Sequence, residues 1–322
     1  MTNKFSFFLS VLLALAAFVG LIICPDASTG GARTGLLLCS GVIIPSLFPF
    51  MVLGNLFLEL GLPNWLGKIL SPVTKKLFGV SGAGSAAFFL GIAGGYPLGA
   101  ITVSEMYTSG VLKKSEAERL LSFCNNSGPA FIVSVAGSAV FGSVKIGLCL
   151  YAIHIISAVF TGILLKNRKE VFASIDPPIT SVNFSAAFTR SIKRAAGTIV
   201  TVCGFVVFFS VLVGLLDSYG SLSVLSGDIS SKLGTELHFS RSLLTGFLEL
   251  GTGTSSMLGL STNAENLALC SFIIGWGGIS VHAQASSVIR EGGLNPALHT
   301  LGKLLHGVLS ALITFFAYPI FF

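Results

Sequence analysis

The sequence carries little charge. Only 10% of its 322 residues are Asp, Glu, Lys or Arg, whereas 52% are apolar and the mean hydropathy is +0.87. A soluble domain of any size needs more polar surface than this, so the composition indicates a polytopic protein of the cell membrane. The net charge of +6 comes from basic residues between apolar runs, where they set topology against an anionic leaflet. We therefore expect a lipid bilayer as partner and no nucleic acid.

Motifs of enzymes and metal sites are also missing. The six cysteines form no Cys-x-x-Cys pair and five lie in apolar runs, which argues against a zinc site or a disulfide framework. There is no His-Glu-x-x-His, no Gly-x-Ser-x-Gly and no P-loop. An intramembrane hydrolase needs a nucleophile and a base within reach, and no such pair is evident. We expect no enzyme, no metal and no bound cofactor.

What is present is a series of long apolar runs. A helix of about 20 residues, rising about 1.5 Å per residue, crosses a hydrocarbon core of about 30 Å. No small-x-small cleavage site follows the first run, so it is interpreted as a retained helix rather than a signal peptide. The predicted crossings are Phe5–Ile23, Leu36–Leu60, Phe123–Phe141, Ile146–Leu165, Ala195–Leu216, Leu267–Ile289 and Ala297–Phe321.

Two further apolar segments, Ser85–Thr108 and Ser242–Leu260, are broken near their middles. Each arm has about nine to twelve residues and reaches only about halfway across a bilayer. If Ser85–Thr108 crossed, basic clusters at 68–76 and 113–119 would face opposite sides. As a re-entrant hairpin it keeps both on the cytoplasmic side, together with the basic loop 166–194, and leaves only Lys145 outside. The hairpin is therefore favoured.

The same interpretation places a second hairpin on the opposite face. Each half then contains a helix, a surface segment, a hairpin, a broken crossing and a closing helix, in opposite orientations. The predicted fold is all-α, with inverted-topology repeats, two re-entrant hairpins and broken helices, a cytoplasmic N-terminus and an outer C-terminus. The predicted parts are an N-terminal transmembrane helix at 1–33, a first repeat at 34–165, a cytoplasmic linker at 166–194 and a second repeat at 195–322.

Surface helices are predicted where apolar residues recur at helical spacing among polar ones. Asn64–Phe78 shows this pattern most clearly, with lysines between its apolar residues. Ser221–Leu237 and Lys113–Leu121 are shorter versions. Such helices lie along the lipid headgroups, and we expect them to orient the hairpins.

The breaks themselves are the most informative feature. They fall at Gly94–Gly99 and Asn125–Pro129 in the first half, and at Glu249–Ser256 and Gly275–Ser280 in the second. An unmade backbone hydrogen bond costs several kcal/mol against lipid, so such breaks persist only inside protein or around a cavity. Packing of small residues explains any one break equally well. Paired breaks in corresponding halves indicate a transporter-type binding site.

Glu249 is the main candidate side chain, because an ionisable group at this depth is costly. It could bind solute, carry a proton or hold Na⁺. The alternative is a structural role, bonding backbone N–H groups or Arg241. His282 could be a proton site or a hydrogen-bonded structural residue. The candidate substrate-binding residues are Gly95, Tyr96, Asn125, Asn126, Ser127, Glu249, Gly251, Thr252, Thr254, Ser255, Trp276, Ser280, His282 and Gln284.

These motifs resemble the nucleoside-recognition, or Gate, domain family of bacterial membrane proteins. The resemblance lies in Gly95–Ala100, Cys124–Pro129, Gly246–Glu249 with the following Gly-Thr residues, and Trp276–Gln284. It implies a fold related to that of concentrative nucleoside transporters. The members most similar in these motifs are implied to serve spore-envelope formation. No nucleoside-binding motif is matched residue by residue.

The resulting hypothesis is a secondary-transporter-like protein that moves a small polar solute or an envelope precursor. Both Na⁺ and H⁺ stay open as coupling ions, and homo-oligomerisation stays open too. The alternative is a non-transporting membrane scaffold or accessory protein required for spore development.

Overall fold

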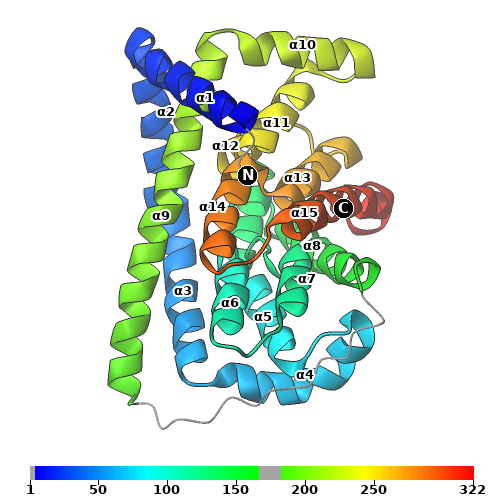
Figure 1. Cartoon of the computed structure of the whole chain (residues 1–322). Helices are drawn as coiled ribbons and strands as arrows, with labels where there is room; N and C mark the ends of the chain where they lie inside the picture. Colours follow the sequence, from blue (N-terminus) through cyan, green and yellow to red (C-terminus); the bar gives the residue numbers. More distant parts are fainter. Residues whose placement is uncertain (1–3, 167–182) are drawn as a thin grey trace.

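A computed structural model describes residues 4–166 and 183–322 of the chain, and in these ranges the protein is built from helices joined by turns (Figure 1). Five of the described helical segments are long and apolar enough to cross a membrane. They are Pro25–Glu59, Val144–Leu164, Phe184–Ser218, Ala264–Glu291 and Ala297–Phe321. Five of the seven predicted crossings therefore appear as long apolar helical segments.

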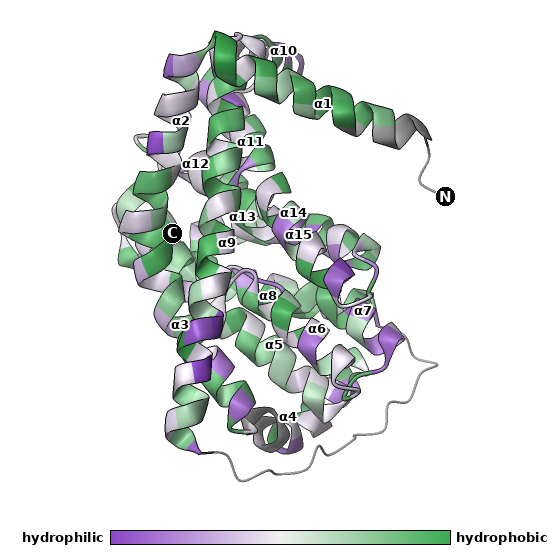
Figure 2. Cartoon of the chain, turned by 60° about the vertical axis from the view of Figure 1, so that its left-hand side comes forward, coloured by the Kyte–Doolittle hydropathy of each residue, from purple (hydrophilic) through white to green (hydrophobic). Residues whose placement is uncertain are grey.

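The first of these is one continuous helix with a π-helical step. It consists of α2 (Pro25–Leu38), the π-segment η1 (Cys39–Ile43) and α3 (Ile44–Glu59). It begins eleven positions before the predicted start at Leu36, and residue 33, where a boundary was predicted, lies inside it. Helix α1 (Lys4–Ile23) precedes it and extends away from the body near the α10 end (Figure 2).

The first repeat continues with helix α4 (Leu62–Phe78), which turns by 91° into α5 (Gly82–Gly94). Helices α5 and α6 (Leu98–Thr108) form the first predicted hairpin. The broken crossing follows as α7 (Lys114–Cys124) and the π-helix η2 (Ala130–Val140), and α8 (Val144–Leu164) closes the repeat.

The second repeat has the same order. Helix α9 (Phe184–Ser218) leads to α10 (Ser221–Leu233), and α11 (Leu237–Leu248) and α12 (Leu250–Ser255) form the second hairpin. The broken crossing is α13 (Ala264–Trp276) and α14 (Gly278–Glu291), and α15 (Ala297–Phe321) closes the repeat. Helix α9 begins eleven positions before the predicted Ala195, so the last eleven residues of the predicted linker are helical. Its remaining part, with Arg168 and Lys169, lies outside the described residues.

Figure 1 shows α4 lying across one end of the molecule and α10 across the other. Each leads directly into the hairpin of its repeat, so the two hairpins enter from opposite ends. The inverted arrangement predicted from the breaks is therefore confirmed. At the α4 end, Arg190 pairs with Glu59 at 2.8 Å and Lys166 donates to the carbonyl of Lys76 at 2.5 Å. Basic residues of the 68–76 cluster and of the 166–194 loop thus share one end of the protein.

Two local predictions were wrong. The segment Lys113–Leu121 is not a surface helix, because most of α7 is buried between α5, α6, α8 and α15. Its polar residues are held internally: Glu116 accepts the backbone N–H of Ser81 at 2.5 Å. The Gly-Thr residues 251–254, predicted to lie in the Glu249–Ser256 break, are also not part of the reversal. Glu249 is the extended residue there, and Gly251–Thr254 form the helix that follows.

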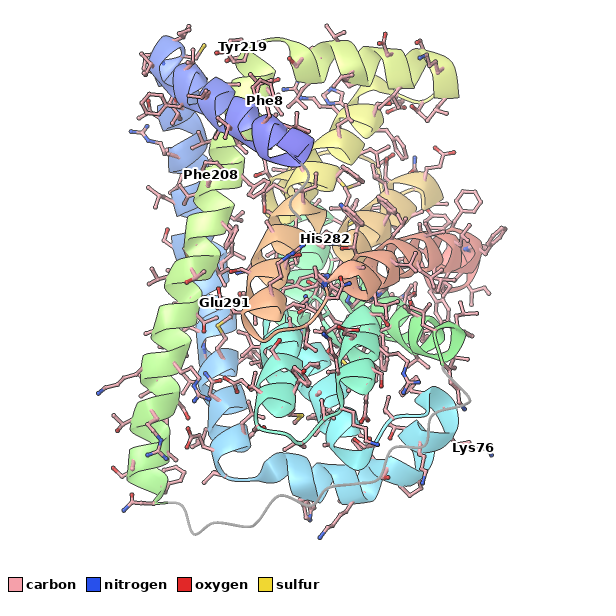
Figure 3. All side chains as sticks on the ribbon, in the orientation of Figure 1. Phe8, Lys76, Phe208, Tyr219, His282 and Glu291 are labelled. Carbon is pink, nitrogen blue, oxygen red and sulfur yellow. The ribbon has the colours of Figure 1, made fainter. Side chains whose placement is uncertain are left out.

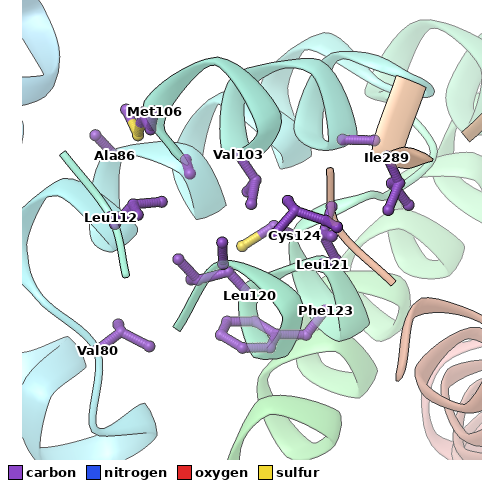
Figure 4. Packing of buried hydrophobic residues seen from close by; sticks show 14 of the residues in the cluster. Val80, Ala86, Val103, Met106, Leu112, Leu120, Leu121, Phe123, Cys124 and Ile289 are labelled. Atoms are coloured by element: carbon purple, nitrogen blue, oxygen red, sulfur yellow. The ribbon is translucent and has the colours of Figure 1, made fainter. Parts of the chain in front are cut away.

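The core beside the first hairpin is packed from both repeats. Phe123, Leu120 and Cys124 of α7 pack with residues of α5 and α6 and with Ile289 of α14 (Figure 4). The outer faces instead expose large apolar side chains such as Phe208 and Phe316. Figure 2 shows that α1 and much of α9 consist of hydrophobic residues. Apolar side chains that face outward suit a protein surrounded by lipid, because the bilayer is as apolar as they are.

Candidate functional site

The tip of the first hairpin rests on the break of the first crossing. A Cβ atom at Gly95 would lie 2.8 Å from the backbone N of Gly128, so this contact needs glycine. One turn earlier, a Cβ at Gly91 would lie 1.7 Å from the carbonyl oxygen of Cys124. The hairpin and the break are therefore in backbone contact, and a larger residue at either glycine would separate them.

The second hairpin meets the second break in the same way. A Cβ at Gly278 would lie 2.9 Å from the backbone N of Leu250 and 3.2 Å from Cα of Glu249. The two halves are then joined by Tyr96, whose hydroxyl donates to the carbonyl of Ile274 at 3.1 Å. All four predicted breaks thus converge on one region inside the protein.

A partly open cavity lies at this convergence. Its polar lining comes from all four breaks and from Ser46 of α3. The rest of its wall is apolar. The lining residues are Ile43, Ser46, Leu47, Tyr96, Ser127, Gly128, Phe131, Val202, Phe205, Val206, Glu249, Leu250, Gly251, Ser280, Val281 and Gln284.

Glu249 lines this cavity and also caps a helix. Its side chain is 2% exposed, and Oε2 accepts the backbone N–H of Thr252 at 2.5 Å, at the start of α12. A carboxylate is a favourable group at a helix N-terminus, where backbone N–H groups are unpaired. The predicted alternative partner, Arg241, pairs instead with Asp217 at 2.7 Å. The backbone-capping role is present, and the same carboxylate borders the cavity.

Two other lining side chains have buried polar atoms without a partner. These are Oγ of Ser280 and Nε2 of Gln284, both on α14. A buried polar atom that forms no hydrogen bond destabilises a protein by about 1–3 kcal/mol. Atoms of this kind at a cavity wall are suited to hydrogen bonds with a bound molecule.

Several predicted site residues do not line the cavity but hold the breaks together. Trp276 donates from Nε1 to the carbonyl of Phe247 at 3.0 Å and stacks on that phenyl ring. Asn126 donates to the carbonyl of Phe123 at 2.8 Å, and Thr254 donates to that of Leu250 at 2.8 Å. Gly95, Asn125, Thr252, Ser255 and His282 likewise lie outside the lining.

The sequence prediction missed the apolar wall that α3 and α9 contribute. Ile43 and Leu47 come from the crossing with the π-segment, and Phe205 comes from the middle of α9. A signal existed for the first pair, because Pro45 and Pro49 interrupt the normal bonding of an apolar helix. No comparable signal marks α9.

A buried basic cluster lies beside the Tyr96 ring. It consists of His154 on α8, His282 on α14, and His299, Lys303 and His306 on α15. Figure 3 labels His282, which lies in the interior near α15. Lys303, His299 and His306 are 0% exposed, and Nζ of Lys303 lies 5.1 Å from the centroid of the Tyr96 ring. Of these residues the site prediction included only His282. The sequence signal for this cluster is Lys303, an ionisable residue within the predicted crossing Ala297–Phe321.

Comparisons with known proteins agree with this geometry. A family model described as Gate, nucleoside recognition, matches residues 41–146. The sporulation integral membrane protein YlbJ of Bacillus subtilis (strain 168) is 29% identical over 314 residues, covering 89% of this chain and 76% of that protein.

A solved structure shares the fold over nearly the whole chain. It is the structure of a single-residue variant of CNTnw in the intermediate 3 state, with a TM-score of 0.52 and 14% identity, covering 98% of this chain and 85% of that one. The predicted fold of a concentrative nucleoside transporter is therefore confirmed. The family resemblance is confirmed as well: this integral membrane protein has the nucleoside-recognition Gate pattern at residues 41–146 and is similar to YlbJ over most of its length.

Proposed function

We propose that the protein is a secondary transporter that moves a small polar solute across the cell membrane during spore formation, with its N-terminus in the cytoplasm. The observation that carries the proposal is the convergence of both hairpin tips and both broken crossings on one cavity. Discontinuous helices in opposed repeats are how secondary transporters place a solute site between two gates. The sporulation context rests on the likeness to YlbJ.

The lining defines the kind of solute that would fit. Glu249 supplies an acceptor, and Gln284 supplies an unpartnered donor from Nε2. Helices α3 and α9 supply an apolar wall that includes Phe205 and Leu47. We therefore propose a solute with a hydrogen-bonding edge carrying both a donor and an acceptor, and an apolar or ring-shaped face.

The proposal is tested by reconstituting the full chain in vesicles and measuring uptake of radiolabelled nucleosides, sugars and amino acids. Glu249→Gln is the test variant and Asp228→Asn the matched control, because Asp228 lies on the surface helix α10, away from the cavity. Uptake that is lost in Glu249→Gln and retained in Asp228→Asn supports the proposal. Absence of uptake for every solute, together with support of sporulation by Glu249→Gln in a Bacillus subtilis strain lacking YlbJ, would favour the scaffold alternative.

A further inference from the structure

Four of the five histidines in the sequence belong to the basic cluster, although they come from three helices. Nζ of Lys303 lies 2.9 Å from Nδ1 of His306, whose Nε2 lies 3.0 Å from the carbonyl oxygen of His154. The ring centroids of His154 and His306 are 4.3 Å apart. A buried amine and several imidazoles in mutual contact form a group that can hold a proton, since each of these side chains is a base.

Hydrogen bonds determine which of these nitrogens are free to take a proton. The backbone N–H of Ser127 donates to Nε2 of His154 at 3.1 Å, so this nitrogen must keep its lone pair. The amide of Asn125 is oriented by the N–H of Ala100, which donates to Oδ1 at 3.4 Å. Its Nδ2 therefore donates to Nε2 of His299 at 3.0 Å. The break of the first crossing thus holds His154 and His299 neutral.

His306 differs from these two residues. Because the carbonyl of His154 can only accept, Nε2 of His306 must carry a hydrogen. Nδ1 of His306 then points its lone pair at Nζ of Lys303. A single proton can lie on either atom of this pair, as Nζ–H···Nδ1 or as Nζ···H–Nδ1. A second proton would place two cations in contact, which like-charge repulsion opposes.

No acidic group neutralises this pair among the described residues. Besides His306 and His299 on its own helix, Lys303 is faced by Tyr96, by His154 of α8 and by His282 of α14. Helices α7 and α13 also pack on α15 and contribute the buried thiols Cys124 and Cys270. On α7, Glu116 accepts the backbone N–H of Ser81 and Glu118 accepts that of Asn295. Arg119 of the same helix donates to the carbonyl of Gly79. On α13, Glu265 is exposed. Within the described ranges, no cluster of three or more His, Cys, Asp or Glu could hold a metal ion.

From this arrangement we propose that Lys303 and His306 form the proton-binding site of the protein, which makes H⁺ its coupling ion. This inference rests on the proposed transport function. Water at one face would supply the proton to the Nζ–Nδ1 pair and water at the other face would take it up, with no other bond made or broken. The site is linked to the cavity through Tyr96, whose ring faces Lys303, and through Ser127, whose N–H bonds His154. A change in the charge of Lys303 therefore acts on Tyr96 across 5.1 Å and, through His306 and His154, on Ser127 of the cavity wall.

The test is a pH titration of the solute-free full chain in lipid nanodiscs, with ¹⁵N-histidine and ¹³C-lysine labels read by NMR. We expect Nδ1 of His306 and Cε of Lys303 to change together with one midpoint, while His154 and His299 stay neutral. His238, which is exposed on α11 and outside the cluster, serves as an internal reference. In Lys303→Met the His306 midpoint should shift by about one pH unit or more, which is a tenfold change in proton affinity. In the control Lys145→Met, which replaces an exposed lysine, it should not move.

The proposal is overturned if His306 and Lys303 show no change from about pH 5 to about pH 10, or if they titrate at separate midpoints. The wild-type titration alone decides this, so a variant that fails to fold does not leave the question open. The result is also separable from transport. Joint titration without solute uptake would refute transport and retain the proton site. Solute uptake without titration of His306 would retain transport and refute the proton site.

Discussion

The cavity and the basic cluster both adjoin Tyr96 of the first hairpin tip, and they differ in how their ionisable groups are bonded. Glu249 borders the cavity and is bonded by the backbone at a helix N-terminus, where a negative charge is favoured. Lys303 is enclosed, and among the described residues its hydrogen-bond partner is the nitrogen base His306. Backbone bonding holds the Glu249 side chain in one position, whereas a lysine beside a histidine can exchange a proton with it. The comparison separates a fixed site for solute from a titrating site for an ion.

The largest expected effect is on stability and comes from the cluster. Lys303→Ala removes a fully buried side chain and leaves Nδ1 of His306 unpaired, so the free energy of unfolding should fall by about 3–5 kcal/mol. Lys145→Ala, at an exposed position, should change it by less than about 0.5 kcal/mol. Thermal unfolding of the purified proteins in detergent measures both. Equal melting temperatures for the two variants would show that the enclosed lysine has no structural role.

The next effect tests whether the two repeats depend equally on close backbone contact. A Cβ at Gly99 would lie 2.1 Å from the Cys124 carbonyl oxygen, and one at Gly253 would lie 2.1 Å from Cα of Gly246. Gly99→Ala and Gly253→Ala should each destabilise the protein by about 1–3 kcal/mol, because the contacting backbone must shift. Gly197→Ala, with open space around it, is the control. A loss of stability in only one of the two variants would show that only one hairpin is held by close packing.

Glu249→Gln should separate binding from stability. The amide oxygen of Gln can still accept the Thr252 N–H, so the free energy of unfolding should change by less than about 1 kcal/mol. Solute affinity should fall about tenfold or more, because a charge-assisted hydrogen bond is lost. Ligand binding to detergent-purified protein, followed by calorimetry once a solute is identified, measures this. Full affinity in the variant would remove Glu249 from the solute site.

The smallest effect has the opposite sign. Ser280→Ala removes a buried hydroxyl that has no partner, so the solute-free protein should become more stable by about 0.5–1 kcal/mol. The same change should weaken solute binding if that hydroxyl bonds the solute. Ser122→Ala is the matched control, since the Ser122 hydroxyl donates to the Arg119 carbonyl at 2.6 Å and its loss brings no such gain. Destabilisation by Ser280→Ala in a melting experiment would show that the hydroxyl already has a partner.

Much of the cavity could be predicted because the chemistry of its residues lies in local motifs. Tyr96, Ser127, Glu249, Gly251, Ser280 and Gln284 were predicted from the breaks and line the cavity. Asn126 and Trp276 were predicted from the same motifs but bond the backbone of the breaks. Sequence cannot separate these groups, since a polar residue at a helix break can point into a cavity or cap the broken helix.

The sequence by itself determined the membrane class, the two inverted repeats and the position of each break. These follow from hydrophobic length and from the cost of unpaired backbone in lipid, which are properties of local sequence. Only the tertiary structure decided that Glu249 faces a cavity while Lys303 is enclosed with four histidines. His154 and His306 are 152 positions apart, and their contact depends on how α8 packs against α15. Polar and small residues recur at helical spacing along the buried faces of α8 and α15, but this spacing does not say which two faces meet, and helix packing decides that.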